Sequence, residues 1–307
     1  MSKRILHFVI TPFMIASKKW LNYFKTESKK DILNDKLLLP RIKSFATYYT
    51  YWNKIQVNKN FFVFILIDDE LDEKYIYMLK DSIKEFDNIY IVKNREKFLS
   101  SNYYMDYETQ KLNSKYNNFK KLNDYIGEIV IDGTKIHMLK NFDYFITTRT
   151  DDDNILDKNA IDIIQQNCSG VELDLKIFGF EYGYILIDKI YHFKYPEFKN
   201  RIIMSSIGLS LIMKMNNENI TNSFNIYFAH HGQIMESLKK ISNNKSFFKN
   251  PINEKDLRYY YKDKVNRSWI YNNKLSFTGT KGKNLKLSEN EIKDFKDKFG
   301  ESSLFEF

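Results

Sequence analysis

The run FFVFILI at residues 61–67 is the strongest indication of the fold class, because every one of its positions is apolar. A strand that is apolar on both faces is typical of the middle of a parallel sheet that helices cover. Apolar residues with helical spacing stand on either side of it, at residues 41–53 and 73–86. Further strand-sized runs occur at residues 5–10, 88–92 and 144–148. This alternation predicts an α/β protein built from right-handed βαβ units, with a Rossmann-like sheet flanked by helices.

The pattern changes near residue 168 and predicts a second half of mixed, mainly antiparallel strands. Short alternating runs and turn signals predict strands at residues 171–178, 182–195, 208–215 and 224–229, a hairpin at 269–277 and a charged helix at 289–299. We therefore expect residues 1–168 and 169–307 to be two halves of one continuous domain, of which the first is mainly parallel and the second is smaller and antiparallel.

The chain of 307 residues has 48 Lys and Arg against 39 Asp and Glu, which gives a net charge of +9. Only seven of the basic residues are arginines, the residue that specific phosphate and base contacts favour. We expect no specific nucleic-acid binding, although a basic nucleic-acid-binding protein stays a rival hypothesis. The single cysteine excludes a disulfide scaffold. No run approaches the ~20 apolar residues of a membrane-spanning helix, so we expect a cytoplasmic protein with at most weak contact to the anionic inner membrane face.

Three consecutive carboxylates, Asp151, Asp152 and Asp153, follow the apolar strand predicted at residues 144–148. Their position after a strand puts them at the carboxyl edge of the sheet, where open α/β sheets bind ligands. In an extended segment Asp151 and Asp153 share a face. Hard oxygen ligands of this kind suit Mn²⁺ or Mg²⁺ bound to a diphosphate. A solvated loop that caps the next helix is the structural alternative.

Other candidate residues lie at the ends of predicted elements. Asp68 ends the strand at 61–67, where a carboxylate can accept hydrogen bonds from a base or a ribose. Arg149 precedes the acid run and either binds a phosphate or braces the carboxylates. His231 can be a metal ligand, a phosphate contact or a general base. The remaining candidates are Thr11 and Arg41 near the same edge and, as a carboxylate base for a transfer reaction, Glu172 or Asp188, with Asp174 and Glu181 left open.

These residues occur in an order that resembles a rhamnosyltransferase family with a glycosyltransferase-A-type fold. The shared pattern consists of HFVIT at 7–11, Arg41 with Phe45, FFVFILID at 61–68 and TRTDDDN at 148–154. Two positions differ from the family pattern, since Pro12 stands in place of an arginine and Asn154 in place of a further aspartate. The resemblance covers about residues 5–235 and includes His231.

The resemblance implies a metal-dependent glycosyltransferase. Such an enzyme moves a sugar, for example rhamnose or another deoxyhexose, from a nucleoside-diphosphate sugar to a glycan or lipid-linked glycan of a surface polysaccharide. It implies that the first half binds the nucleotide sugar through a metal held by Asp151 and Asp153, and that the second half binds the acceptor. Asp68 would contact the nucleotide and Arg149 would brace the site. A nucleotidyltransferase or a phosphohydrolase that uses the same carboxylates is the first alternative.

Overall fold

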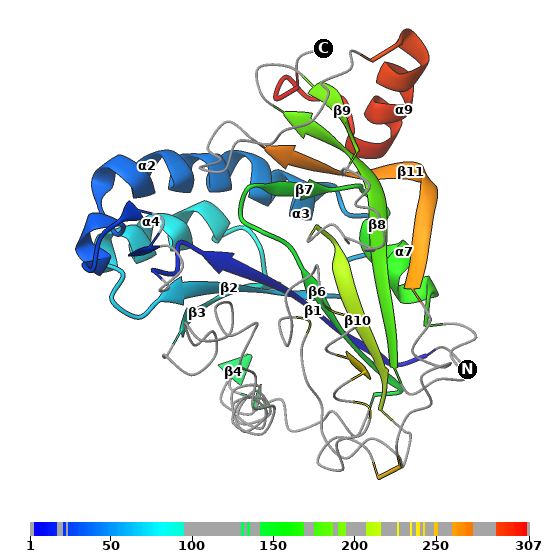
Figure 1. The fold of residues 1–307 in the computed structure, drawn as a ribbon, viewed down its shortest axis with the longest axis horizontal. Helices are drawn as coiled ribbons and strands as arrows, with labels where there is room; N and C mark the ends of the chain where they lie inside the picture. The colour runs from blue at the N-terminus through cyan, green and yellow to red at the C-terminus, as the bar shows by residue number, and fades with distance from the viewer. Residues whose placement is uncertain are drawn as a thin grey trace.

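The computed structural model shows a mixed α/β protein whose main sheet takes strands from both halves of the chain (Figure 1). The mixed α/β class that the sequence predicts is confirmed. The structure describes residues 3–16, 21–22, 24–94, 130–131, 134–135, 142–168, 175–186, 190–194, 207–215, 226, 234, 238–239, 242, 249–250, 260–272 and 287–305.

The first half forms four parallel strands that match the predicted apolar runs. In their order across the sheet these are β3 (Ile89–Asn94), β2 (Phe62–Asp68), β1 (Ile5–Phe13) and β6 (Tyr144–Arg149). β1 is longer than predicted, because it continues through Pro12. A proline, which has no N–H to donate, is tolerated there because the pairing of β1 with β6 has already ended, at Ile10 with Arg149.

The second half, together with the short strand β7 (Asn154–Leu156) from the end of the first half, extends this sheet beyond β6. In order, the added strands are β10 (Leu209–Lys214), β8 (Leu175–Leu186), β11 (Tyr260–Asn272) and β7, and β9 (Ile190–Lys194) pairs with β8. Most of these pairs are antiparallel, but β11 runs parallel to β8. A separate short pair joins β4 (Val130–Ile131) to β5 (Thr134–Lys135). The smaller antiparallel portion is therefore confirmed, with one parallel pair inside it.

Three details of the second half differ from the predictions. The two strands expected at 171–178 and 182–195 are not separated between residues 178 and 182. One strand, β8, continues through this region to Leu186, and its pairing with β11 keeps it extended. Residues 269–272 are the end of the long strand β11, and residues 273–277 of the expected hairpin lie outside the described residues. The described residue of the expected strand at 224–229, Ile226, has a 3-10 conformation.

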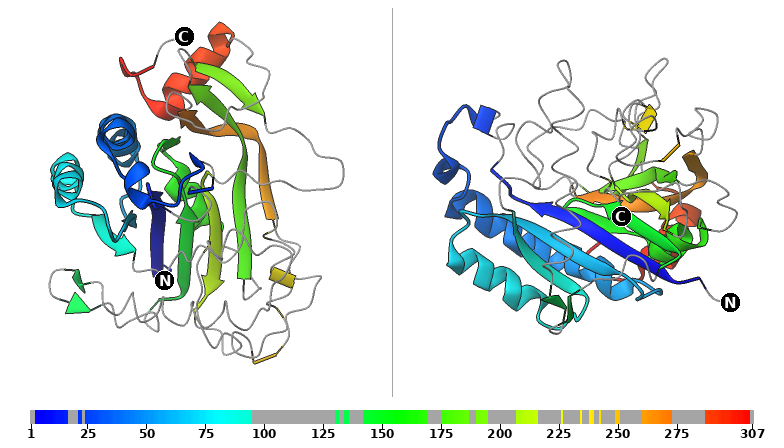
Figure 2. Two further views of the ribbon diagram at one scale, coloured as in Figure 1. Left: turned by 60° about the vertical axis from the view of Figure 1, so that its left-hand side comes forward. Right: turned by 90° about the horizontal axis from the view of Figure 1, so that it is seen from below.

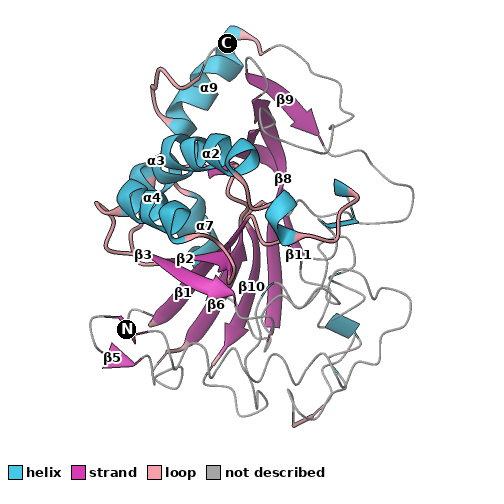
Figure 3. Ribbon diagram, turned by 90° about the vertical axis from the view of Figure 1, so that its left-hand side faces the viewer, coloured by secondary structure: helices cyan, strands magenta, loops and turns pink. Residues whose placement is uncertain are grey.

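Helices cover one face of the sheet, most of them over its parallel half, as Figures 2 and 3 show. Their bounds are η1, a 3-10 turn (Lys29–Asp31), α2 (Asp35–Ser44), η2, a π-helix (Phe45–Tyr49), α3 (Thr50–Ile55), α4 (Glu73–Ile83), α7 (Ala160–Gln166) and α9 (Glu289–Phe299). α2, η2 and α3 follow one another without a break and together include the helix predicted at 41–53. α9 has the predicted bounds, and Gly300 ends it with a φ of 79°.

The core explains why these strands are apolar on both faces. Val9, Ile65 and Ile146, one from each of three neighbouring strands, pack in the same buried cluster as the helix residues Leu79 and Ile161. On the opposite face, the buried rings of Phe8, Phe64 and Phe145 pack edge to face, with centroids 4.7 and 5.3 Å from that of Phe8. Both faces of these strands are therefore buried, as the apolar runs predict.

Candidate functional site

The three aspartates follow β6 in a tight turn at the carboxyl edge of the parallel strands. The Asn154 N–H closes this turn by donating to the Asp151 carbonyl at 3.1 Å. Because the chain turns here, the three side chains enter different surroundings. The side chain of Asp151 is 31% exposed, that of Asp153 is 11% exposed and that of Asp152 is 1% exposed. The run is therefore largely buried, which argues against a solvated loop.

Asp152 is paired with Arg41 of helix α2. The Arg41 Nε donates to Asp152 Oδ2 at 2.6 Å, and the Nη2 of Arg41 donates to Asp152 Oδ1. Burial alone would lower the pKa of Arg41, but the charge of Asp152 and these hydrogen bonds raise it, so the guanidinium stays charged. Burial in turn raises the pKa of Asp152 against the opposing charge of Arg41. This buried fork fastens the acid run to α2. The sequence predicts that Arg41 lies near this edge but does not identify Asp152 as its partner. Nucleotide binding by Arg41 stays a prediction.

Asp153 is the acid that its surroundings leave incomplete. Its Oδ2 lies 3.9 Å from Arg41 Nη2, while its buried Oδ1 has no hydrogen-bond partner among the residues that the structure describes. Burial raises the pKa of Asp153 to about 8; the charge of Arg41 opposes this shift, and the charges of Asp152 and Asp151 add to it. A carboxyl group in such a place is stabilised by a proton or by an additional cation.

Arg149 lies between the sheet and the most exposed acid. It ends β6, and its Nη2 lies 3.5 Å from Asp151 Oδ1. Its own side chain is largely buried. Of the two roles considered for Arg149, this geometry favours bracing of Asp151, because the guanidinium already faces a carboxylate.

The chemistry of Asp151 and Asp153 fits a divalent cation in part. Both offer carboxylate oxygens, and Asp153 Oδ1 is buried without a described partner. In the described part of the chain, no group of three or more His, Cys, Asp or Glu side chains is arranged to hold a metal ion. Mg²⁺ commonly binds proteins through one or two carboxylates and takes its other oxygens from substrate phosphates and water. This pair of acids suits that mode and does not form a closed protein cage.

Thr11 is fully buried and is bonded to another residue of the protein, and nucleotide binding by Thr11 stays a prediction. Its Oγ1 shares a 2.5 Å hydrogen bond with the hydroxyl of Tyr49, and both residues are fully buried. Burial raises the pKa of Tyr49, and the charges of Asp152 and Asp151 add to that shift. Tyr49 lies in the π-helix η2, and such turns are frequent at functional sites. This contact is not predictable from the sequence, because the spacing of Tyr49 is that of any core residue in a helix.

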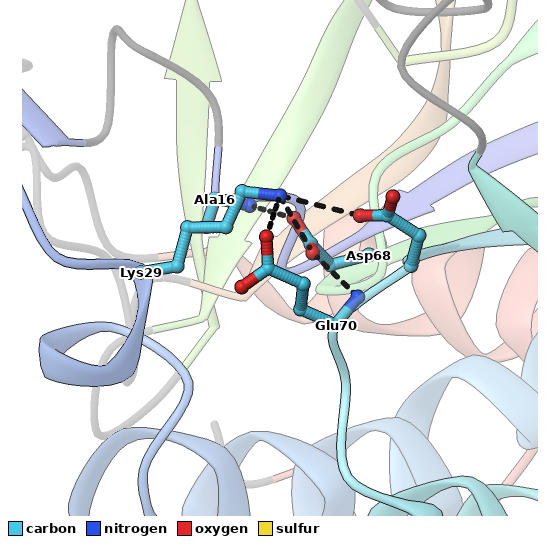
Figure 4. Close-up of polar contacts among 5 residues, drawn as sticks. Ala16, Lys29, Asp68 and Glu70 are labelled. Atoms are coloured by element: carbon cyan, nitrogen blue, oxygen red, sulfur yellow. Dashed lines mark hydrogen bonds and ion pairs between the residues drawn. The ribbon is translucent and has the colours of Figure 1, made fainter.

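Asp68 ends β2 and is surrounded by donors from the protein itself (Figure 4). Its Oδ2 accepts from the Ala16 N–H at 2.9 Å, and its Oδ1 accepts from the Glu70 N–H at 3.0 Å and from Lys29 Nζ at 3.3 Å. Lys29 Nζ also lies 3.0 Å from Glu70 and 3.2 Å from Asp69. Burial alone would lower the pKa of Lys29, but the bond to Glu70 and the charge of Asp68 raise it. Asp68 thus anchors the chain that follows β1, and its contact with a nucleotide stays a prediction.

The structure brings together some of the predicted site residues and leaves others untested. Arg41, Asp152 and Asp153 meet at one place, and Arg149 and Asp151 form the neighbouring pair. Three predicted residues lie outside the described residues, namely the candidate bases Glu172 and Asp188 and the candidate metal ligand His231.

Comparisons with known proteins add distant likenesses. No family model and no curated protein matches the chain. Among solved structures, it is similar to the 1–349 fragment of S. aureus TarS in complex with UDP-GlcNAc, at 9% identity and a TM-score of 0.36, over 90% of this chain and 60% of that chain. A structure of S. aureus TarS matches at 9% identity and a TM-score of 0.38, over 88% of this chain and 36% of that chain.

A third likeness is to a protein of Bacillus anthracis assigned as a glucose-1-phosphate thymidylyltransferase, in complex with a sucrose. The identity is 11% and the TM-score is 0.33, over 86% of this chain and 88% of that chain. The chain thus spans less than two thirds of either TarS structure. Identities and TM-scores this low carry no argument about function, so the chemistry of the site rests on this chain's own residues.

A helix that is both long and apolar enough to cross a membrane does not occur in the described parts of the chain.

Proposed function

We propose that this chain is a metal-dependent glycosyltransferase that uses a nucleoside-diphosphate sugar as its donor. The observation that carries the proposal is Asp153, a buried carboxyl group at the carboxyl edge of the sheet. Its Oδ1 has no hydrogen-bond partner among the described residues, and burial raises its pKa to about 8. Perturbed groups of this kind concentrate at functional sites, where a ligand completes them. The ion pair between Arg41 and Asp152 neutralises the neighbouring acid, so Asp153 is the acid that a ligand would complete, beside the Asp151 that Arg149 braces.

Mn²⁺ or Mg²⁺ would be held by Asp151 and Asp153 together with oxygens of the donor's diphosphate. Bound there, the ion would supply positive charge against the negative charge that develops on the leaving diphosphate. The chain's own residues would do the positioning. Arg41 fixes the turn through Asp152, and Arg149 orients Asp151 from 3.5 Å away. Glu172 or Asp188 is proposed as the base that takes the acceptor's proton, and His231 as a further ligand of the metal or the diphosphate.

The finer assignments rest on the family resemblance. The donor sugar would be rhamnose or another deoxyhexose, and the acceptor a glycan or a lipid-linked glycan of a surface polysaccharide. A lipid-linked acceptor would be met at the inner membrane face, where the net charge of +9 favours weak attraction to anionic headgroups.

The experiment incubates the full chain with a panel of nucleotide sugars and glycan acceptors, with Mn²⁺, with Mg²⁺ or with EDTA. We expect release of free nucleoside diphosphate that depends on the metal. Asp153→Asn should lower that rate by about 10²–10³, the usual cost of one well-placed electrostatic contact. The matched control is Asp81→Asn, since Asp81 is an exposed acid on α4 that pairs with Lys84.

Other products would assign the site differently. Release of pyrophosphate from a nucleoside triphosphate and a sugar phosphate would identify a nucleotidyltransferase, and phosphate release without any acceptor would identify a phosphohydrolase. Equal nucleoside diphosphate release with metal and with EDTA would contradict the role of Asp151 and Asp153 in metal binding.

A further inference from the structure

A chain of buried hydrogen bonds crosses the sheet and ends beside the acid run. Gln165 of α7 contacts His7 of β1, with 3.3 Å between Nε2 and Nδ1, and His7 Nε2 lies 2.7 Å from Thr148 Oγ1 on β6. Thr148 Oγ1 lies 2.7 Å from Ser210 Oγ on β10, and Ser210 Oγ lies 3.0 Å from the Gly208 carbonyl. The side chains of His7, Thr148, Ser210 and Gln165 are all buried. None of these contacts belongs to the site described above.

The amide of Gln165 sets the direction of this chain. Asn58 Nδ2 donates to Gln165 Oε1 at 3.0 Å, and Gln165 Nε2 donates to the Asn60 carbonyl at 2.7 Å. The contacts with Asn58 and Asn60 therefore require the same orientation of the Gln165 amide, with its oxygen toward Asn58 and its nitrogen toward Asn60. Gln165 Nε2 therefore also donates to His7 Nδ1, and the hydrogen of the neutral imidazole must be on Nε2. Burial lowers the pKa of His7 to about 3, which keeps the ring neutral.

Every later bond in the chain then has one direction. Thr148 accepts a hydrogen bond from His7, so the only hydrogen of its hydroxyl group goes to Ser210. Ser210 in turn donates to the Gly208 carbonyl. A buried chain in which each hydrogen has a single place specifies one geometry for the groups at its end.

The hydrogen-bond chain ends at a turn that lies against residues before and after the acid run. The Gly208 N–H donates to the Arg149 carbonyl at 2.9 Å. Gly208 has a φ of +69°, and a Cβ at this position would lie 2.7 Å from Phe180 and 3.2 Å from Leu156, which belongs to β7. The turn therefore fits between β8 and the strand that follows the acids. Arg149, whose carbonyl it holds, carries the guanidinium that braces Asp151.

We infer that His7 and Thr148 are positioning residues, whose directed hydrogen bonds fix the Gly208 turn and, through the Arg149 carbonyl, the start of the acid run. This inference rests on the proposed function only for its consequence in metal binding. The hydrogen-bond chain itself is tested without any ligand.

The first experiment reads the imidazole directly by nitrogen-15 NMR of the full chain. We expect His7 to be a neutral ring with its hydrogen on Nε2, and we expect no titration of this ring between about pH 5 and about pH 8, because its pKa is about 3. A hydrogen on Nδ1, or a ring that titrates in this range, would overturn the inference.

The second experiment interrupts the series of hydrogen bonds at Thr148, its central residue. Thr148→Val keeps the shape of the side chain and removes the hydroxyl, whereas Thr148→Ser keeps the hydroxyl. We expect Thr148→Val to speed hydrogen exchange of the Gly208 amide and to weaken Mn²⁺ binding, each by roughly tenfold, as loss of a supporting hydrogen bond behind a metal ligand does. Thr148→Ser should restore both, and Ser210→Ala should repeat the effect of Thr148→Val one step later.

The matched control is Thr147→Val in the same strand. The Thr147 hydroxyl is also buried, but it accepts from the Ile226 N–H at 2.9 Å and is not part of the chain. If Thr147→Val speeds exchange at Gly208 as much as Thr148→Val does, or if Thr148→Val changes neither measurement, the inference is wrong. If the unaltered protein binds no Mn²⁺ while exchange at Gly208 responds as expected, the positioning role stands and the proposed metal site fails.

Discussion

Two clusters of carboxylates stand at the carboxyl ends of the two strands that flank β1, and they differ in how their charge is balanced. After β2, Lys29 lies within 3.3 Å of Asp68, Asp69 and Glu70. After β6, Arg41 donates two hydrogen bonds to Asp152, and its Nη2 lies 3.9 Å from Asp153. The first cluster is satisfied by the chain itself, while the second leaves a buried oxygen open among the described residues.

An aspartate after a buried strand is therefore not by itself evidence of a ligand. Both clusters have the same sequence signature, an apolar run followed by acids. What separates them is the supply of donors. Asp68 receives two backbone N–H groups and one ammonium, whereas Asp153 Oδ2 lies 3.9 Å from the Arg41 guanidinium and Asp153 Oδ1 has no hydrogen-bond partner among the described residues. A ligand is expected where the supply falls short.

The largest expected effect concerns Arg41. Arg41→Met should lower the free energy of unfolding by about 3–5 kcal/mol, because it leaves the charge of Asp152 buried without a partner. Urea unfolding measures this cost. The double variant Arg41→Met with Asp152→Asn should recover most of it, since the unpaired charge is then gone. A cost below about 1 kcal/mol for Arg41→Met would show that the pair does not hold the acid run in place.

The sequence predicts the parallel half well because its signals are local. The apolar runs that became β1, β2 and β6 are buried on both faces, so the run itself carries the information. The second half is less predictable. The parallel pairing of β11 with β8 joins residues 260–272 to residues 177–186, and no local pattern specifies a partner so far along the chain.

The sequence predicts where the acids of the site lie but not which residues neutralise their charges. The position of Asp151 and Asp153 follows from the strand before them. The partner of Asp152 is Arg41, which is 111 residues away in the sequence. The π-helix that brings Tyr49 to Thr11 cannot be recognised from the spacing of apolar residues. Whether a carboxylate is open or satisfied depends on such distant contacts, so the sequence alone could not separate Asp68 from Asp153.

A smaller effect is expected in the pH dependence of stability. Burial raises the pKa of Asp153 from 3.8 to about 8 in the folded protein. Between these values the folded state keeps a proton that the unfolded state has released. The stability from this group is therefore fully present below about pH 4, falls as the pH rises, and changes no further above about pH 8. Asp153→Asn should remove this loss.

Urea unfolding of both proteins in EDTA, at several pH values, measures the difference. The variant should be the more stable protein at pH 8, and its advantage should shrink toward pH 4. Addition of Mn²⁺ should raise the unfolding midpoint of the unaltered protein and leave that of the variant nearly unchanged. Parallel pH profiles for the two proteins would contradict the view that Asp153 is incomplete.

The smallest expected effect concerns Lys29, and it tests the satisfied cluster. The Lys29 side chain is 26% exposed, and those of Asp69 and Glu70 are 38% and 61% exposed, so water and salt screen these pairs. Asp68 would also keep its bonds to the Ala16 and Glu70 N–H groups. Lys29→Met should therefore lower the free energy of unfolding by at most about 1 kcal/mol. Thermal unfolding at low and at high salt should show the difference from the unaltered protein becoming smaller as salt is added.

Lys84→Met, which breaks the surface pair with Asp81, is the control and should change nothing measurable. If Lys29→Met were as costly as Arg41→Met and insensitive to salt, the cluster after β2 would depend on its single cation as strongly as the acid run depends on Arg41. The contrast between a satisfied and an incomplete cluster would then be lost, and Asp68 would have as strong a claim to a ligand as Asp153.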